Sequence, residues 1–136
     1  MIKTETTLRV RYGETDQMGF VYYGNYAQYY EVGRVEAMRS LGFSYKEMEE
    51  SGVLMPVINL TINYKKPALY DDEVRIVTMV KEMPSVRITF EYECYNKKNE
   101  LLNTGSVTLV FIDKQKNRPS APPDWFMKGF LEKFKS

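Results

Sequence analysis

Hydrophobic and polar residues alternate along five stretches of the chain, which is the pattern of strands that bury one face. The alternation covers residues 4–12, 58–65, 74–80 and 86–95, and it returns in a last stretch that ends near residue 111. Segments rich in Pro, Ser and Asn at 83–85 and 96–100 are typical of turns between strands. The residues expected on the buried faces include Leu8, Val10, Tyr12, Ile58, Leu60, Ile62, Val74, Ile76, Val80, Ile88, Phe90, Tyr92, Cys94, Val107, Leu109 and Phe111.

The period changes between Asn25 and Leu41, where one stripe of residues follows helical spacing. Apolar and small side chains recur at i, i+4, i+7, i+11 and i+15, which predicts a helix with one buried face. Gly42 is expected to end this helix as a C-cap. The residues of the stripe are Tyr26, Tyr30, Gly33, Ala37 and Leu41.

Two further helices are marked by their first residues. Ser44 and Glu47 have the spacing of a capping box, which predicts a short helix that ends near Gly52. The pair Pro122-Pro123 precedes a terminal helix with an aromatic face. The predicted order is β-α-β-β-β-β with a trailing helix, in one domain over residues 1–136. Short turns between the last four strands predict an antiparallel meander covered by the central helix, so the class is α+β.

Composition excludes several kinds of chemistry. The 136 residues contain no histidine, which excludes Ser-His-Asp and Cys-His catalysis, His-ligated zinc and an imidazole base. A single cysteine, Cys94, forms neither an intramolecular disulfide nor a metal cluster, and it is expected to be a buried, inert thiol. A net charge of +1 argues against a general nucleic-acid binder. Without a signal-like N-terminus or a long apolar run, a cytoplasmic protein that does not insert into membranes is expected.

A carboxylate and a helix start lie close together in the sequence between the first strand and the central helix. Asp16 stands in a Gly-containing loop, and Tyr23 and Gly24 directly precede the helix, whose first N–H groups lack intrahelical acceptors. Such N–H groups stabilise a developing oxyanion while a carboxylate attacks a carbonyl or activates water. The arrangement is a workable hydrolytic site without histidine.

The string R-Y-x-E-T-D-x-M-G-x-V-Y-Y-x-N-Y, from Arg11 to Tyr26, is followed by Y-E-x-G-R. Together they resemble the hotdog-fold acyl-CoA thioesterases of the 4-hydroxybenzoyl-CoA thioesterase type. A second string, N-Y-K-K-P-A-x-Y-D-D-E-V from Asn63 to Val74, is also similar to that family. The resemblance covers nearly the whole chain, and it implies an antiparallel sheet wrapped around a central helix.

The resemblance also assigns roles to positions. It implies that Asp16 is the essential carboxylate and that the backbone N–H of Tyr23, helped by that of Gly24, polarises the thioester carbonyl. It implies hydrolysis of an acyl- or aroyl-CoA without a metal or bound cofactor. It further implies a homo-oligomer, at least a dimer with two sheets joined edge to edge and the active sites at the junction; tetramers are common in such proteins.

The residues around this motif leave alternatives open. Glu14 is a second candidate for the working carboxylate, and Asn25 is a helix cap or a substrate contact. Glu31 and Arg34 are expected to form an i,i+3 helix pair, and a buried Glu31 would instead support the loop or take part in catalysis. Substrate contacts are expected from Phe20, Tyr22 and Tyr26 around the acyl group and from Lys65 and Lys66 toward the CoA phosphates.

Two other functions remain open beside acyl-CoA hydrolysis. One is hydrolysis of an acyl chain carried by an acyl-carrier protein. The other is non-catalytic binding of acyl-CoA or an acyl carrier. A hotdog dehydratase is set aside because such enzymes depend on a histidine, which this chain lacks.

Overall fold

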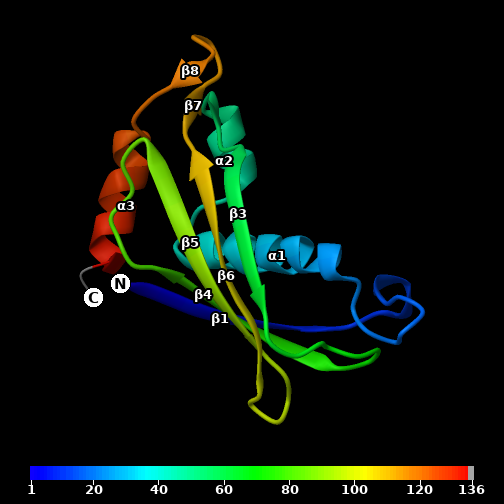
Figure 1. Cartoon of the computed structure of the whole chain (residues 1–136). Helices are drawn as coiled ribbons and strands as arrows, with labels where there is room; N and C mark the ends of the chain where they lie inside the picture. The colour runs from blue at the N-terminus through cyan, green and yellow to red at the C-terminus, as the bar shows by residue number, and fades with distance from the viewer. Residues whose placement is uncertain (135–136) are drawn as a thin grey trace.

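The computed structural model describes residues 1–134, and its main element is a five-stranded antiparallel sheet (Figure 1). The strand order across this sheet is β1-β4-β5-β6-β3. The predicted α+β class, with a sheet around a central helix and a C-terminal helix, is confirmed. The strands are β1 (Ile2–Arg9), β3 (Val57–Tyr64), β4 (Glu73–Val80), β5 (Arg87–Tyr95) and β6 (Leu101–Val110).

The predicted meander is wrong at one connection, because β3 does not pair with β4. Strand β3 pairs with β6 at one edge of the sheet, whereas β4 lies in the interior between β1 and β5. The burial patterns explain this placement. Seven of the eight residues of β3 are exposed, whereas six of the eight residues of β4 are buried, which suits an interior strand.

Helix α1 (Tyr26–Ser40) lies along one face of the sheet, as Figure 1 shows. Four residues of the predicted stripe, Tyr26, Tyr30, Gly33 and Ala37, are buried, whereas Leu41 is half-buried and directly follows the helix. A Cβ atom on Gly33 would lie 2.5 Å from the hydroxyl oxygen of Thr78 in β4, so glycine lets the helix backbone approach the sheet. The helix ends at Ser40 with Leu41 as its C-cap, one residue before the predicted Gly42, which follows with the left-handed φ of +87° that favours glycine.

Tyr30 fastens α1 to the middle of the sheet. Its ring stacks on Tyr92 of β5, with centroids 4.1 Å apart and an interplanar angle of 5°. Its hydroxyl donates a 2.6 Å hydrogen bond to Oδ1 of Asn103 in β6. Gly105 leaves the space that this ring occupies, because a Cβ there would lie 2.6 Å from the Tyr30 hydroxyl. The first turn of α1 is therefore held in a fixed position over the sheet.

Short elements complete the fold. Helix α2 (Tyr45–Glu50) is capped as predicted, since the Ser44 hydroxyl accepts from the backbone N–H of Glu47. Helix α3 (Asp124–Phe134) buries Phe126 and Phe130. The strands β2 (Val53–Leu54), β7 (Ile112–Asp113) and β8 (Arg118–Pro119) form a second sheet that the sequence did not predict, because two-residue strands are too short for an alternating pattern.

The first strand is shorter than predicted. Strand β1 ends at Arg9, and Tyr12 begins a 3₁₀ turn, η1 (Tyr12–Glu14), with 78% of its surface exposed instead of buried. The cause is a local hydrogen bond, in which the backbone N–H of Arg11 donates to the Glu14 carboxylate and turns the chain. Strand β3 also differs from the prediction, because Ile58 and Leu60, which were expected on a buried face, are 46% and 44% exposed.

Two smaller expectations concern single features. Cys94 is buried as predicted, and burial raises the pKa of its thiol to about 12. Within residues 1–134, no helix has the length and apolar character that crossing a bilayer requires.

Candidate active site

Asp16 lies in the loop between η1 and the helix start, and the loop backbone fixes its carboxylate. Oδ1 of Asp16 accepts hydrogen bonds from the backbone N–H groups of Met18 (2.9 Å) and Phe20 (3.4 Å). The backbone N–H of Asp16 donates to the carbonyl of Phe20 at 2.8 Å, and the N–H of Gly19 donates to the carbonyl of Asp16 at 3.0 Å. Gly19 has a φ of +80°, so glycine permits this tight turn. One carboxylate oxygen is thus anchored, whereas Oδ2 accepts no hydrogen bond from the described residues.

A cavity of about 290 Å³ opens beside Asp16, between the loop, the start of α1 and the end of β3. Six of the nine predicted site residues line it, and its other lining residues are largely apolar. Sequence reasoning missed four lining residues, although Tyr64 and Pro67 flank the two lysines in the second family-like string. The lining residues are Asp16, Met18, Phe20, Val21, Tyr23, Tyr26, Tyr64, Lys65, Lys66 and Pro67.

The helix start presents backbone donors beside this cavity. A 3₁₀ turn, η2 (Tyr23–Asn25), leads directly into α1. The carbonyls of Tyr22 and Tyr23 accept from the backbone N–H groups of Asn25 and Tyr26. Within residues 1–134, the backbone N–H groups of Tyr23 and Gly24 have no acceptor, as expected for the first turn of a helix. The positive end of the helix dipole adds to their attraction for an oxyanion.

Tyr64 connects the edge strand to this helix start. Its hydroxyl donates a 3.1 Å hydrogen bond to the carbonyl of Tyr23, and its ring meets that of Tyr23 edge-on. The carbonyl of Tyr23 and the N–H of Gly24 belong to the same peptide group. A donor on the carbonyl polarises that peptide and strengthens its N–H as a hydrogen-bond donor.

Three predicted residues lie outside the cavity lining. Gly24 and Tyr22 are exposed, and the Tyr22 ring covers Gly24, whose Cβ position lies 3.1 Å from it. The expectation that Asn25 caps the helix with its side chain is wrong, because its amide Nδ2 donates at 2.8 Å to the carbonyl of Glu14 instead. The backbone of Asn25 is already helical, unlike the extended backbone that a capping side chain usually requires.

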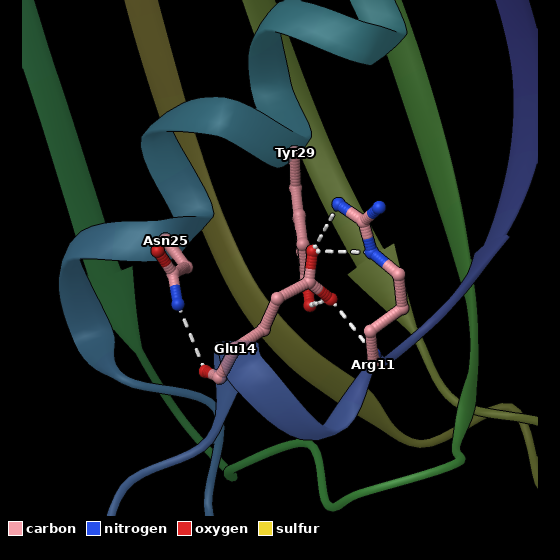
Figure 2. Close-up of polar contacts among 4 residues, drawn as sticks. All are labelled: Arg11, Glu14, Asn25 and Tyr29. Atoms are coloured by element: carbon pink, nitrogen blue, oxygen red, sulfur yellow. Dashed lines mark hydrogen bonds and ion pairs between the residues drawn. The ribbon is translucent and has the colours of Figure 1, made fainter.

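Glu14, the alternative carboxylate, is engaged in a cluster away from the cavity lining (Figure 2). Its carboxylate accepts from the backbone N–H and the guanidinium of Arg11 and from the hydroxyl of Tyr29. Burial raises the pKa of Glu14, but the hydrogen bonds from Arg11 and Tyr29 outweigh it and bring the pKa below its ordinary value of 4.5. A carboxylate with all these donors is a weak base, and of these two carboxylates only Asp16 lines the cavity.

The lysines differ in their surroundings. Lys66 pairs with Glu100, the residue that precedes β6. The side chain of Lys65 makes no hydrogen bond or ion pair within residues 1–134, so its charge is available at the cavity mouth. The predicted i,i+3 pair of Glu31 and Arg34 is wrong, since these two side chains form no ion pair with each other among the described residues 1–134. Burial raises the pKa of Tyr45 to about 12, and the nearby charge of Arg34 partly offsets this.

The described residues contain no group of three His, Cys, Asp or Glu side chains arranged as metal ligands. The family model of the thioesterase-like superfamily matches residues 10–130, a span that includes the Asp16 loop, α1 and every strand of the main sheet except β1. The chain belongs to the thioesterase-like superfamily. This membership confirms the family predicted from the two sequence strings.

Relatives of this thioesterase-superfamily chain are similar over most of their length. YneP of Bacillus subtilis, provisionally named an acyl-CoA thioesterase, is 38% identical over 122 residues, which is 87% of this chain and 88% of YneP. The acyl-CoA thioester hydrolase YbgC of Escherichia coli O157:H7 is 34% identical over 128 residues, 94% of this chain and 92% of YbgC. The enzyme class, acyl-CoA thioesterase, is therefore confirmed.

A solved structure agrees with the fold. The DHNA-CoA thioesterase from Staphylococcus aureus superposes with a TM-score of 0.89 and 38% sequence identity, over 99% of this chain and 90% of that one. The hotdog fold expected from the sequence is confirmed by this likeness.

Proposed function

We propose that this enzyme hydrolyses a small acyl- or aroyl-CoA to a carboxylic acid and free CoA in the cavity beside Asp16. The observation that carries the proposal is the joint position of two groups: Asp16 and Tyr23 line one cavity, and the backbone N–H groups of Tyr23 and Gly24 have no acceptor in residues 1–134. A base and an oxyanion site at one cavity are what thioester hydrolysis needs.

In the general-base route, Oδ2 of Asp16 takes a proton from water as the water oxygen bonds to the thioester carbon. The carbonyl oxygen becomes an oxyanion that accepts from the N–H groups of Tyr23 and Gly24. Collapse of this intermediate re-forms the carbonyl and breaks the C–S bond, and the CoA sulfur recovers a proton from Asp16. In the nucleophilic route, Asp16 itself bonds to the carbon as the C–S bond breaks, and water then hydrolyses the mixed anhydride.

The lining of the cavity supports an acyl group that is flat and apolar. The rings of Tyr23, Tyr26, Tyr64 and Phe20 surround the space beside Asp16. Aromatic rings favour stacked or edge-on contacts with an aromatic acyl group. The Staphylococcus aureus relative is named a DHNA-CoA thioesterase, and this name also favours an aromatic acyl group. The unpaired ammonium of Lys65 at the mouth suits the phosphates of CoA.

A homo-oligomer is part of the proposal. Strand β3 is the edge of the main sheet, and Val57, Ile58, Leu60 and Tyr64 are between 44% and 51% exposed. An apolar unpaired edge is a liability that proteins usually cover. Pairing β3 with β3 of a second copy continues the sheet and places the second copy beside Tyr64 and the cavity. Two such dimers assemble into the tetramer that the family resemblance implies.

The experiment is a free-thiol release assay with acetyl-CoA, palmitoyl-CoA, benzoyl-CoA and 1,4-dihydroxy-2-naphthoyl-CoA. Wild type and Asp16→Asn are compared, with Asp124→Asn as a matched control at the exposed start of α3. We expect turnover of at least one aroyl-CoA and a loss of about 10²–10⁴-fold in kcat for Asp16→Asn, the usual range for removal of a general base. Asp124→Asn keeps wild-type activity.

Other outcomes overturn the proposal. Equal activity of wild type and Asp16→Asn refutes the role of Asp16. If wild type hydrolyses an acyl-acyl-carrier protein but none of the CoA esters, the carrier protein is the substrate. Tight binding of acyl-CoA without any turnover identifies a binding protein.

A further inference from the structure

Glu14 lies outside the cavity lining, yet it is bonded to both halves of the proposed site. Its carboxylate accepts from Arg11, through the backbone N–H at 2.8 Å and the guanidinium at 3.0 and 3.2 Å. The same carboxylate accepts from the hydroxyl of Tyr29, one turn into α1, at 3.0 Å. Figure 2 shows Arg11 and Tyr29 converging on this carboxylate from the loop and from the helix.

The backbone carbonyl of Glu14 makes a second connection to the helix start. It accepts from the backbone N–H of Tyr22 at 2.9 Å and from the side-chain amide of Asn25 at 2.8 Å. Tyr22 directly precedes Tyr23, the first proposed oxyanion donor. Glu14 is also only two residues from Asp16. The bonds of this one residue therefore span the two groups that must act on the same thioester.

The segment between these bonds is a closed turn. Thr15 and Val21 form an isolated antiparallel bridge, and the carboxylate of Asp16 is tied to the backbone inside the turn. The N–H of Val21 donates to Ala68 at 2.9 Å, which fastens the end of the turn to the main body. At the start of the turn, the Glu14 carboxylate connects the chain to α1 through its hydrogen bond with Tyr29.

We propose that Glu14 is a positioning residue, which fixes the separation between the Asp16 carboxylate and the backbone donors of Tyr23 and Gly24. This inference rests on the proposed function of Asp16. The side chain of Glu14 is 15% exposed, so its hydrogen bond with Tyr29 lies in a partly buried environment. Replacing it by an amide turns one acceptor oxygen into an NH₂ group, which faces the donors of Arg11 or Tyr29 and cannot accept from them.

The consequence is a change in geometry without a change in substrate contacts. Displacement of a reacting group by about 1 Å lowers a rate by about 10²-fold. Because Glu14 does not line the cavity, its replacement leaves substrate binding nearly unchanged. We therefore expect Glu14→Gln to lower kcat about 10- to 100-fold, with KM within about twofold of wild type.

The test compares Glu14→Gln and Tyr29→Phe with a matched control, Glu36→Gln. Glu36 pairs with Arg39 at the same i,i+3 spacing on the exposed face of α1, so its replacement makes the same chemical change away from the site. Tyr29→Phe removes a single donor to Glu14, and it gives a smaller loss of kcat with KM unchanged. The control keeps the wild-type kcat and KM.

The decisive measurement is a double-mutant cycle with Asp16→Asn. If Glu14 acts by placing Asp16, then Glu14→Gln lowers kcat in the wild-type background and has less than a twofold effect in the Asp16→Asn background. Far-UV circular dichroism checks that each variant is folded. If Glu14→Gln does not fold, Tyr29→Phe takes its place in the same cycle.

The outcomes separate the two proposals. Asp16→Asn with wild-type kcat refutes the proposed function itself. If Asp16→Asn loses activity, then wild-type kcat in Glu14→Gln refutes the positioning role. Equal losses in both backgrounds, or a loss confined to KM, also refute it, because they show an effect on overall stability or on binding.

Discussion

The hydrogen bond between Tyr30 and Asn103 makes a testable prediction about how α1 is held on the sheet. Both residues are fully buried, at 0% exposure, and the Tyr30 hydroxyl donates to Oδ1 of Asn103 at 2.6 Å. Tyr30→Phe keeps the ring that stacks on Tyr92 but removes the donor. The variant therefore leaves a buried acceptor without a hydrogen-bond partner while most of the packing is kept.

The magnitude follows from that unpaired acceptor. Leaving a buried polar group unsatisfied costs about 1–3 kcal/mol. The Nδ2 atom of Asn103 already has no partner among the described residues, so the amide gains no alternative bond by a small rotation. We expect Tyr30→Phe to lower the free energy of unfolding by about 2 kcal/mol, and Asn103→Leu by a similar amount. In the double variant both groups are apolar, and the loss is smaller than the sum.

The assay is urea unfolding followed by far-UV circular dichroism, at one fixed protein concentration because an oligomer's stability depends on concentration. Tyr12→Phe is the control, since Tyr12 is 78% exposed and its hydroxyl makes no hydrogen bond in residues 1–134. Its effect is expected to stay within about 0.5 kcal/mol. A loss below about 0.5 kcal/mol for Tyr30→Phe, or losses that add in the double variant, would refute the reasoning.

Three further predictions concern the site and the assembly. Tyr64→Phe removes the hydroxyl that donates to the Tyr23 carbonyl. Steady-state kinetics should show kcat about two- to tenfold lower, which corresponds to the net free energy of one hydrogen bond. An unchanged kcat contradicts the polarising role of Tyr64. The pKa of Glu14 is lowered in the folded state, so its ionised carboxylate stabilises the fold above the unfolded-state pKa, and this stabilisation is lost as the pH falls through the folded-state pKa. The difference in unfolding free energy between wild type and Glu14→Gln should therefore be largest near neutrality and shrink below about pH 4. A difference that stays constant with pH argues against this role of the Glu14 charge. Leu60→Lys puts a charge on the exposed edge strand, and light scattering should show a smaller assembly than wild type; an unchanged mass places the interface elsewhere.

The absence of histidine was readable from the composition alone, and it directed attention to a carboxylate. The motif around Asp16 then placed that carboxylate in a loop before a helix, and the structure puts Asp16 and Tyr23 at one cavity as this order requires. Two other local patterns, the helical stripe and the Ser44 cap, predicted the structure for a similar reason. The stripe on α1 and the Ser44 cap depend on residues three or four apart, which touch within one turn of helix.

Contacts between distant segments were beyond the reach of those patterns. Alternation identified β3 as a strand, but its place beside β6 at the edge depends on which faces the whole fold leaves exposed. Tyr64 reaches Tyr23 across 41 positions, and Tyr30 reaches Asn103 across 73. Neither bond leaves a periodic signal in the sequence.

Glu14 shows most clearly what was determined at each level. The sequence alone marked it as one of two carboxylates beside a helix start, and by itself it left both chemical roles open. The folded chain surrounds the carboxylate of Glu14 with donors from Arg11 and Tyr29 and places Asp16 in the lining of the cavity. Residue type and local order therefore determined the chemistry that is possible, whereas the tertiary structure decided which carboxylate lines the cavity, because only folding sets the distances between distant groups and their exposure to solvent.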